Sequence, residues 1–519
     1  MLKVWNRSVL SKFVKTKLDG YRFIVVSNRE PFLHRRVGSR VECIQPASGM
    51  ASALDPIMRA SGGLWIAHGS GDADRQAVDV YDRVQVPPDA PEYTLRRVWL
   101  SKEEEEGHYG GLSNQGLWPL CHVAFTRPMF DPDHWKMYQR VNQKFAEAVL
   151  EEAGNEPTFV FIQDYHFGLL PRMLRNARSN LVIAQFWHIP WPNREVFSAF
   201  PWREELLDGM LGNDLLGFHL PQHCQNFLET IDCSLEAKVD RAGSEVCRGG
   251  HGTAIRPFPI GIDFDEHVQT AACGSIELQM NRWRKELSLD GRMLGIGIDR
   301  LDYTKGIPER LRFLDRLLER HPQYRGRLSF VQIAVPSRSS LPAYRAIENE
   351  VDALVKQINL RWRRGSWRPI TLLKRHCGEV EMIALHQLAD FCVVTSLHDG
   401  MNLVSKEFVA SRTDEDGVLI LSKFAGAARE LKDALLVNPF SVEEGANAYH
   451  TALQMLPDER RRRMAKMREA VDHNNVYRWA GRLLSELVSI EFPQYDTEES
   501  SELETARTRW AELAMEVAV

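Results

Sequence analysis

The chain has 519 residues, too many for one compact core and enough for two large domains. Charged residues make up 26% of the chain and the formal net charge is −5, so the sequence lacks the basic excess typical of nucleic-acid-binding proteins. The eight cysteines form no C-x-x-C pair, which indicates reduced thiols in a cytoplasmic protein. No apolar run is long enough to cross a bilayer, and no metal-ligand spacing is visible.

Short β-rich runs alternate with amphipathic helices along the whole sequence. The expected strands cover residues 22–27, 158–162, 181–186, 293–298, 328–334, 370–373, 391–395, 418–421 and 435–437. The expected helices cover residues 135–152, 308–320, 341–362 and 380–387. This alternation predicts an α/β fold in which helices cover parallel sheets, and the length suits two such sheets.

A proline-rich passage at residues 256–263 is the best candidate for a linker between two domains. A helix expected near residues 475–490 follows the last strand and could cross back onto the first domain. The predicted units are an N-terminal arm (1–20), an N-terminal domain (21–262), a C-terminal domain (263–473), the crossing helix (474–492) and a C-terminal tail (493–519).

Two cations follow the strand expected at 293–298. Arg300 and Lys305 stand immediately before a helix that begins with Ile307 and Pro308. Ligands of open α/β sheets bind at the carboxyl ends of the strands, where this pair would lie. An arginine offers a planar fork to two phosphate oxygens and a lysine supplies a point charge, so the pair suits a diphosphate. A surface turn could carry the same spacing, so the pair alone only suggests this ligand.

Four further polar residues lie at expected strand ends or helix starts. Asp164 and His188 could hydrogen-bond sugar hydroxyls, or could equally be a helix cap and a buried core histidine. Asp399 and Glu407 lie on either side of an expected helix start, whose backbone N–H groups can bind a sugar or a phosphate. A carboxylate such as Glu407 can accept from both hydroxyls of a ribose. Together with the two cations, these residues favour a nucleotide-sugar site.

From about residue 23 to about residue 490 the chain resembles the trehalose-6-phosphate synthase family of retaining glycosyltransferases. The motifs that carry the resemblance include Val26-Ser27-Asn28-Arg29, Gly62-Gly63-Leu64-Trp65, Asp164-Tyr165-His166, His188-Ile189-Pro190, Arg300-Leu301-Asp302-Tyr303 and Asp399-Gly400-Met401-Asn402-Leu403-Val404. The resemblance implies the GT-B fold, with two Rossmann-like domains that face each other across a cleft.

The resemblance also implies the roles of individual residues. The catalytic residues would be Arg300, Lys305, Asp164, His188 and Asp399. The donor would be bound by Ser48, Gly49, Arg300, Lys305, Asp399, Gly400, Met401, Asn402, Leu403, Val404 and Glu407. The acceptor would be bound by Arg29, Trp65, Tyr109, Trp118, Asp164 and Arg338.

The chain departs from the family pattern at three places. Ser48 replaces the first of two glycines, Gln163 stands where histidine is usual, and His398 stands where arginine is usual. These changes leave the implied reaction in place. That reaction is transfer of glucose from UDP-glucose, or another nucleoside diphosphate glucose, to glucose 6-phosphate with retention, which gives trehalose 6-phosphate.

Three alternatives stay open at this point. A related transferase could use another acceptor such as glycerol 3-phosphate, a regulatory homologue could lack catalysis, and a glycosidase could use two facing carboxylates. We expect the two small-molecule substrates to be the principal ligands, with no cofactor, no metal, no nucleic acid, no membrane and no partner protein. The protein is expected to be a cytoplasmic homo-oligomer.

Overall fold

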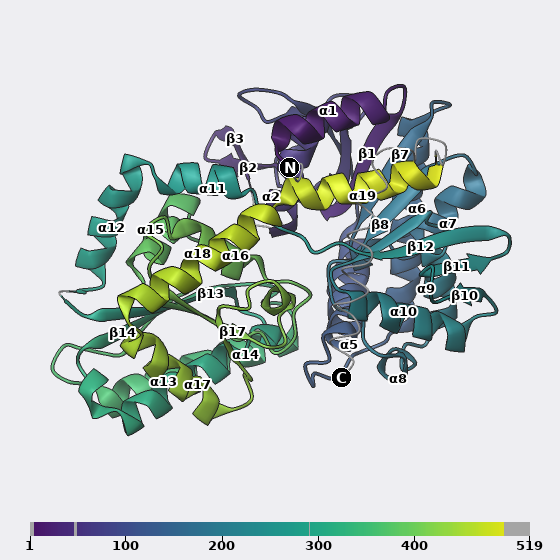
Figure 1. Ribbon diagram of the computed structural model, residues 1–519. Coiled ribbons are helices and arrows are strands. Elements are labelled where there is room, and N and C mark those ends of the chain that lie inside the picture. Colours follow the sequence, from purple (N-terminus) through teal and green to yellow (C-terminus); the bar gives the residue numbers. More distant parts are fainter. Residues whose placement is uncertain (1–4, 46–48, 290, 492–519) are drawn as a thin grey trace.

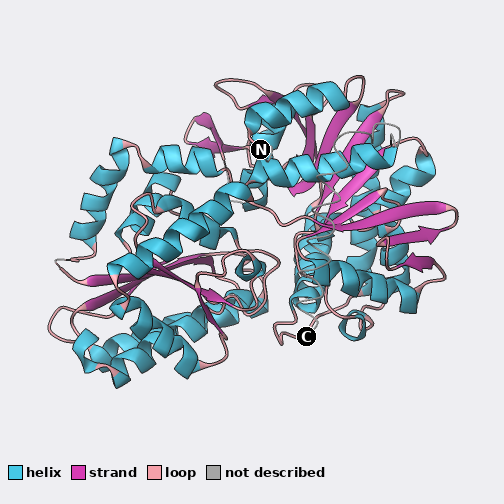
Figure 2. Cartoon of the chain, viewed as in Figure 1, coloured by secondary structure: helices cyan, strands magenta, loops and turns pink. Residues whose placement is uncertain are grey.

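The computed structural model describes residues 5–45, 49–289 and 291–491. Within these ranges the chain forms two lobes, and helices cover the sheet of each lobe (Figures 1 and 2). The first lobe contains a ten-stranded sheet and the second a six-stranded sheet. The predicted α/β fold with two sheets is therefore confirmed.

The sheet of the first lobe is parallel at its centre and antiparallel near both edges. In spatial order its strands are β10 (Lys238–Asp240), β11 (Glu245–Arg248), β12 (His251–Pro257), β9 (Leu215–Phe218), β8 (Val182–Phe186), β7 (Thr158–Gln163), β1 (Arg22–Arg29), β4 (Leu64–His68), β6 (Tyr93–Val98) and β5 (Arg83–Val86). A separate hairpin joins β2 (Leu33–Val37) to β3 (Arg40–Ile44).

The sheet of the second lobe is parallel throughout. Its strands, again in spatial order, are β15 (Ile370–Leu373), β14 (Leu328–Val335), β13 (Met293–Arg300), β16 (Phe391–Val394), β17 (Val418–Ser422) and β18 (Leu435–Val437). Because helices cover both faces of such sheets, the central strands are apolar runs with almost every residue buried.

The helices connect the strands and cover the sheets. Those of the first half are α1 (Arg7–Lys17), α2 (Gly49–Ser61), α3 (Asp74–Ala77), α4 (Lys102–Glu105), η1 (Glu106–Leu117), α5 (Trp118–His122), α6 (Pro132–Ala153), η2 (Tyr165–Phe167), α7 (Leu170–Ala177), α8 (Arg194–Phe197), α9 (Arg203–Met210) and α10 (Pro221–Ser234). Those of the second half are α11 (Phe264–Ala271), α12 (Gly274–Glu286), η3 (Tyr303–Lys305), α13 (Ile307–Arg320), η4 (Pro322–Tyr324), α14 (Pro342–Trp362), α15 (Glu379–Leu388), α16 (Leu403–Ser411), η5 (Gly426–Arg429), α17 (Val442–Gln454), α18 (Pro457–His473) and α19 (Val476–Glu491).

Helix α19 leaves the second lobe and lies along the first (Figure 1). The ring of Trp479 is 5.9 Å from that of Phe161 and 5.1 Å from that of Phe186, so the helix packs on strands β7 and β8. This helix occupies most of the crossing segment predicted at 474–492. The predicted arm at 1–20 contains α1, which packs on α2 and α19. The predicted tail at 493–519 lies outside the described residues.

The two passages of the chain between the lobes contact each other. The amide of Val476 donates to the carbonyl of Ile262 over 3.0 Å. A Cβ atom on Gly261 would lie 2.0 Å from the carbonyl oxygen of Asn474, a separation that side chains do not tolerate. The glycine therefore permits the outgoing and returning segments to lie against each other at the predicted boundary near 262.

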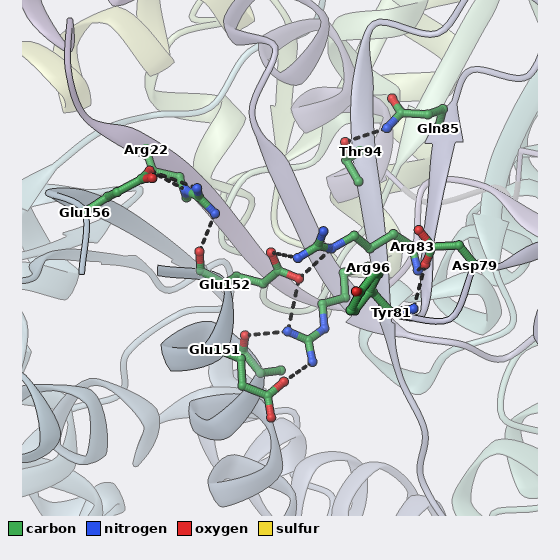
Figure 3. Close-up of polar contacts among 11 residues, drawn as sticks. Arg22, Asp79, Tyr81, Arg83, Gln85, Thr94, Arg96, Glu151, Glu152 and Glu156 are labelled. Atoms are coloured by element: carbon green, nitrogen blue, oxygen red, sulfur yellow. Dashed lines mark hydrogen bonds and ion pairs between the residues drawn. The ribbon is translucent and has the colours of Figure 1, made fainter. Parts of the chain in front are cut away.

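Glu152 of α6 fixes that helix to the strands at one edge of the first sheet (Figure 3). Its carboxylate accepts from Arg83 of β5 at 2.8 and 2.9 Å and from Arg96 of β6 at 3.1 Å. The side chain of Glu152 is only 3% exposed, so these contacts lie away from bulk water. The neighbouring pair of Arg22 and Glu156 is at the surface, where the glutamate is 63% exposed.

We expect Glu152→Ala to lower the free energy of unfolding by about 1.5–3 kcal/mol, because two guanidinium groups lose a largely buried carboxylate. Glu156→Ala is the matched control and should lower it by less than about 1 kcal/mol, since exposed ion pairs contribute little. Urea denaturation followed by tryptophan fluorescence measures both. Equal losses in the two variants would contradict the anchoring role of Glu152.

Candidate active site between the two lobes

Two arginines from different lobes converge on one tyrosine hydroxyl. Arg29, the last residue of β1, donates from Nη2 to Oη of Tyr109 over 2.7 Å. Arg338, which follows β14 in the second lobe, donates from Nε to the same oxygen over 3.4 Å. Two guanidinium groups around one oxygen are the arrangement that suits a phosphate. The structure thus brings together three of the residues predicted to bind the acceptor.

The second lobe fixes the direction of Arg338. Its backbone has a φ of 50°, in the left-handed region that an arginine rarely adopts, and its side chain is 7% exposed. Nη1 donates to the hydroxyl of Tyr344 and lies 3.5 Å from Oδ2 of Asp302. Burial opposes the charge of Asp302, but Arg338 and Arg300 outweigh it and keep the pKa of this carboxyl below its usual value. The aspartate and the tyrosine thus orient the guanidinium toward the first lobe.

Tyr109 has an unusual acidity for a phenol. Burial alone would raise its pKa, but the charges of Arg338 and Arg29 lower it to about 7. The phenol oxygen therefore occupies a position where negative charge is strongly stabilised. A phosphate dianion bound near the same two arginines would experience the same stabilisation.

Tyr109 lies on a π-helix, η1, which is a rare element that is often found at functional sites. Two glycines allow this wide helix to approach α6 closely. A Cβ atom on Gly107 would lie 2.7 Å from Cγ of Met137, and one on Gly111 would lie 2.4 Å from Nδ1 of His134. The glycines therefore let η1 pack closely on α6, which fixes the backbone around Tyr109.

Trp118 begins the helix that follows η1, and its ring lies close to both Arg338 and Arg300. The guanidinium carbon of Arg338 is 4.6 Å from the ring centroid, and that of Arg300 is 5.8 Å away. Aromatic faces attract cations at these distances. Among the described residues, Nε1 of the indole is buried without a hydrogen-bond partner. The ring therefore links the cation predicted for the acceptor, Arg338, with the cation predicted for the diphosphate, Arg300.

The predicted diphosphate pair lies at the carboxyl end of β13, as expected. Arg300 is the last residue of that strand, and Lys305 closes the short helix η3. Within the described chain, the guanidinium of Arg300 makes no hydrogen bond, and its central carbon lies 5.8 Å from the centroid of the Trp118 ring. Nζ of Lys305 instead donates to Oδ2 of Asp399 over 2.6 Å. One cation is therefore uncommitted and the other is paired.

Asp399 is held ionised by its neighbours. Its Oδ2 also accepts from Oγ of Ser396 at 3.1 Å and from Nδ2 of Asn402 at 3.3 Å. Burial would raise the pKa of this carboxyl, yet Lys305 keeps it well below its usual value. A carboxylate that stays charged in a buried site can accept hydrogen bonds from sugar hydroxyls across the ordinary pH range.

Gly400 allows the second lobe to contact the first beside Asp399. A Cβ atom at this position would lie 2.6 Å from the carbonyl oxygen of His188 and 2.9 Å from Cδ2 of His219. Position 400 therefore requires glycine, because a side chain there would clash with His188 and His219. The contact brings the predicted donor loop directly against a residue predicted to lie between the two sugars.

The rest of the donor loop leads into α16. Met401 is buried, and Asn402, with a φ of 96°, caps the helix by accepting from the amide of Ser405 at 3.0 Å. The residues Leu403 and Val404 form the first turn. Glu407 follows on the same helix, where burial and the nearby charge of Glu379 raise its pKa to about 7. Its carboxylate has no cationic partner among the described residues, which leaves it able to accept from a ribose.

Asp164 and His188 are joined at the carboxyl ends of β7 and β8. The amide of His188 donates to Oδ1 of Asp164 over 3.1 Å. Burial raises the pKa of Asp164 to about 7 and lowers that of His188 to about 3, so the imidazole is neutral. Asp164 has a φ of 72°, a strained value that is typical of functional positions.

Two of the predicted site residues are not seen with the others. Trp65 is fully buried in β4, donates to Oγ of Ser27 over 2.7 Å and stacks on Tyr93, so its contacts lie in the core of the first lobe. Ser48 lies outside the described residues. Gly49 is the first residue of α2.

Three residues outside the predicted set also belong to the site. Asp302 and Tyr344 orient Arg338, and the hydroxyl of Tyr165 lies 3.5 Å from Nη2 of Arg338. Asp302 and Tyr165 are within recognised motifs, so their spacing could have indicated them. Tyr344 lies on a helix far along the chain from these motifs, and only the fold reveals it.

Known relatives share most of this chain. A trehalose-6-phosphate synthase from Mycolicibacterium vanbaalenii is 38% identical over 490 residues, which cover 92% of this chain and 98% of that protein. A bifunctional trehalose-6-phosphate synthase/phosphatase from Thermoproteus tenax is 37% identical over 491 residues, and the match spans 65% of its length.

Solved structures agree with this relationship. An alpha,alpha-trehalose-phosphate synthase (UDP-forming) from Burkholderia xenovorans, in complex with glucose-6-phosphate, matches with a TM-score of 0.81 and 31% identity over 90% of this chain and 99% of that one. An E. coli protein bound with UDP-2-fluoro glucose matches with a TM-score of 0.80 and 32% identity over the same shares. The model of glycosyltransferase family 20 matches residues 21–489. The chain belongs to glycosyltransferase family 20.

Proposed function

We propose that the protein transfers glucose from UDP-glucose to glucose 6-phosphate, with retention at the donor carbon, to give trehalose 6-phosphate. The cluster of Arg29, Tyr109 and Arg338 is the observation that carries the proposal, because it offers an acceptor phosphate two guanidinium groups and a hydroxyl. The glucose-6-phosphate complex and the UDP-2-fluoro glucose complex of the two structural relatives support the choice of acceptor and donor.

The donor would lie against the second lobe. Arg300 and Lys305 would bind its diphosphate, Asp399 and the loop of Gly400 would bind its glucose, and Glu407 would bind its ribose. Negative charge grows on the diphosphate as the glycosidic bond breaks, so the two cations stabilise the transition state more than the ground state.

No carboxylate in this arrangement is required as a nucleophile. In the proposed mechanism the acceptor hydroxyl attacks from the side of the leaving group, and the leaving phosphate takes the acceptor proton. Asp164 and the neutral imidazole of His188 would hydrogen-bond the sugars at the junction of the lobes. Binding and orientation, with charge stabilisation at the diphosphate, then account for the rate.

An acceptor screen tests the proposal. The wild-type enzyme is incubated with UDP-, ADP- or GDP-glucose and either glucose 6-phosphate or glycerol 3-phosphate, and nucleotide release and product are measured. Trehalose 6-phosphate should form fastest from UDP-glucose and glucose 6-phosphate. Faster use of glycerol 3-phosphate would overturn the acceptor assignment, and no release of nucleotide with any pair would indicate a regulatory homologue.

We further propose a cytoplasmic homo-oligomer that needs no metal, so that activity persists in EDTA. The cation pair can neutralise the diphosphate in place of a divalent ion. In the part of the chain that the structure describes, no helix combines the length and the apolar character that a membrane span needs.

We expect Arg338→Ala to raise the KM for glucose 6-phosphate strongly, because loss of a largely buried charge contact costs roughly 2–5 kcal/mol. The affinity for UDP should not change. Arg345→Ala, at an exposed arginine on the same helix as Tyr344, is the control and should behave like the wild type. Steady-state kinetics and calorimetry measure the two effects, and a normal KM in Arg338→Ala would exclude the phosphate role.

Arg300→Ala and Lys305→Ala should each lower turnover by on the order of 10²-fold or more, because each removes charge stabilisation from the leaving group. The two variants should differ in a second respect. Lys305 pairs with Asp399, whereas Arg300 has no carboxylate partner among the described residues, so only Lys305→Ala should also weaken glucose recognition. Rapid-mix turnover and circular dichroism test this, and near-normal turnover in both variants would exclude the diphosphate assignment.

UDP-glucose affinity should rise as the pH increases through about 7, where Glu407 ionises. The ionised carboxylate accepts from both ribose hydroxyls, whereas the protonated form accepts less well. Calorimetric titration with UDP-glucose at pH 6 and pH 8 measures this, since the diphosphate of that ligand does not titrate in the range. Glu407→Gln should bind more weakly and lose the dependence; a variant that kept it would assign the titration to another group.

A further inference from the structure

Gln163, the last residue of β7, contacts the site through a single side-chain hydrogen bond. The residue is fully buried, and its Oε1 lies 2.9 Å from Nε2 of His188. Among the described residues, its own Nε2 has no hydrogen-bond partner. A buried amide with free donors is costly and calls for an explanation, because nearly all such groups are paired in native proteins.

Most of the polar groups of His188 have a partner within the protein. Its amide donates to Asp164, and its carbonyl accepts from Nε2 of His219 at 3.0 Å. The ring packs edge-on against Phe186, with centroids 4.6 Å apart. Of its two ring nitrogens, Nε2 is taken by Gln163, and Nδ1 has no partner in the described chain.

Nδ1 of His188 is available where the two lobes meet. The carbonyl of this residue lies against Gly400, beside the carboxylate of Asp399 that would bind the transferred glucose. The residue is half-buried, and Nδ1 is not among the sealed polar atoms. A hydroxyl of a sugar bound beside Asp399 would supply the partner that this nitrogen lacks among the described residues.

An amide is a distinctive partner for an imidazole. A carboxylate would favour the charged ring, whereas a neutral amide does not stabilise the extra proton. Burial already lowers the pKa of His188 to about 3. The amide can accept from Nε2–H, which leaves Nδ1 as an acceptor, or it can turn over and donate to Nε2, which makes Nδ1 a donor. Because its own Nε2 has no other partner, no second bond fixes either orientation.

We propose that Gln163 is a positioning residue that holds the His188 ring and presents its neutral Nδ1 to a hydroxyl of the sugar in the cleft. This inference rests on the proposed glucosyl transfer. The amide can support either tautomer of the ring, so Nδ1 can accept from the sugar hydroxyl or donate to it. A histidine at this position would have the same ability to accept or donate.

The test compares three substitutions at Gln163. Gln163→Leu keeps the size and removes both polar atoms, and Gln163→Asn keeps the amide but shortens the reach. Both should lower kcat/KM for transfer by about 10–100-fold, by analogy with loss of the hydrogen-bond partner that orients a metal-ligating histidine. UDP affinity should be unchanged, since the side chain of Gln163 makes no hydrogen bond to the described residues that are proposed to bind the nucleotide. Gln163→His should restore transfer to within a few-fold of the wild type.

Gln332→Leu is the matched control. This residue is also a fully buried glutamine at a central strand, but its amide bonds to Arg310 within the second lobe. It should lower thermal stability without the selective loss of kcat/KM. Equal losses of kcat/KM in Gln163→Leu and Gln332→Leu would overturn the inference, as would unchanged kcat/KM in Gln163→Leu.

A second readout does not depend on transfer. Side-chain ¹⁵N spectra, with the His188 signals assigned by their absence in His188→Asn, should show a hydrogen-bonded neutral ring in the wild type and a shifted Nε2 signal in Gln163→Leu. Unchanged His188 signals would overturn the inference. If the wild type transferred glucose to no acceptor, the proposed function would fail, while these spectra would still decide whether Gln163 controls the ring.

Discussion

The guanidinium of Arg338 is the group on which the site depends most. It belongs to the second lobe, but the oxygen it shares with Arg29 belongs to the first, so the proposed phosphate site is complete only when the lobes face each other. Asp302 and Tyr344 supply the opposing force that keeps an arginine in a strained backbone conformation. The acceptor phosphate would therefore act as a bridge between lobes, and its binding would favour the closed cleft.

Steric packing as well as charge determines how the two lobes meet at this junction. Gly400 lets the donor loop contact the His188 backbone, and the glycines of η1 let the Tyr109 helix approach α6. Charged and neutral side chains also occupy different parts of this junction. Lys305 keeps Asp399 ionised, while burial keeps His188 neutral. Donor recognition can thus rely on charge at the diphosphate, and sugar recognition on directed hydrogen bonds at the junction.

The sequence predicted all six strands of the second sheet but only three of the ten strands of the first, β1, β7 and β8. Central parallel strands are long apolar runs and their carboxyl ends carry polar residues, whereas the remaining strands of the first sheet gave no such signal. Arg300, Asp164 and Asp399 lie where that rule places them. The sequence could not predict that η1 would be a π-helix. The glycines of η1 matter because they let it pack closely on α6, and this packing is visible only in the folded chain. Tyr344 was missed for the same reason, since its role arises from contacts between distant segments. Trp65, by contrast, belongs to one of the motifs that carry the family resemblance, yet its side chain is buried in the core of the first lobe.

The paired passages between the lobes limit how the cleft can move. The segments near Gly261 and Asn474 cross side by side and are joined by the bond between Val476 and Ile262. Two chain connections at one place allow the lobes to rotate about the line through the connections, but they resist sliding and twisting of one lobe against the other. Any opening of the two lobes would thereby be restricted to nearly one degree of freedom. Such a motion would return Arg338 to the same position opposite Tyr109 each time the lobes closed.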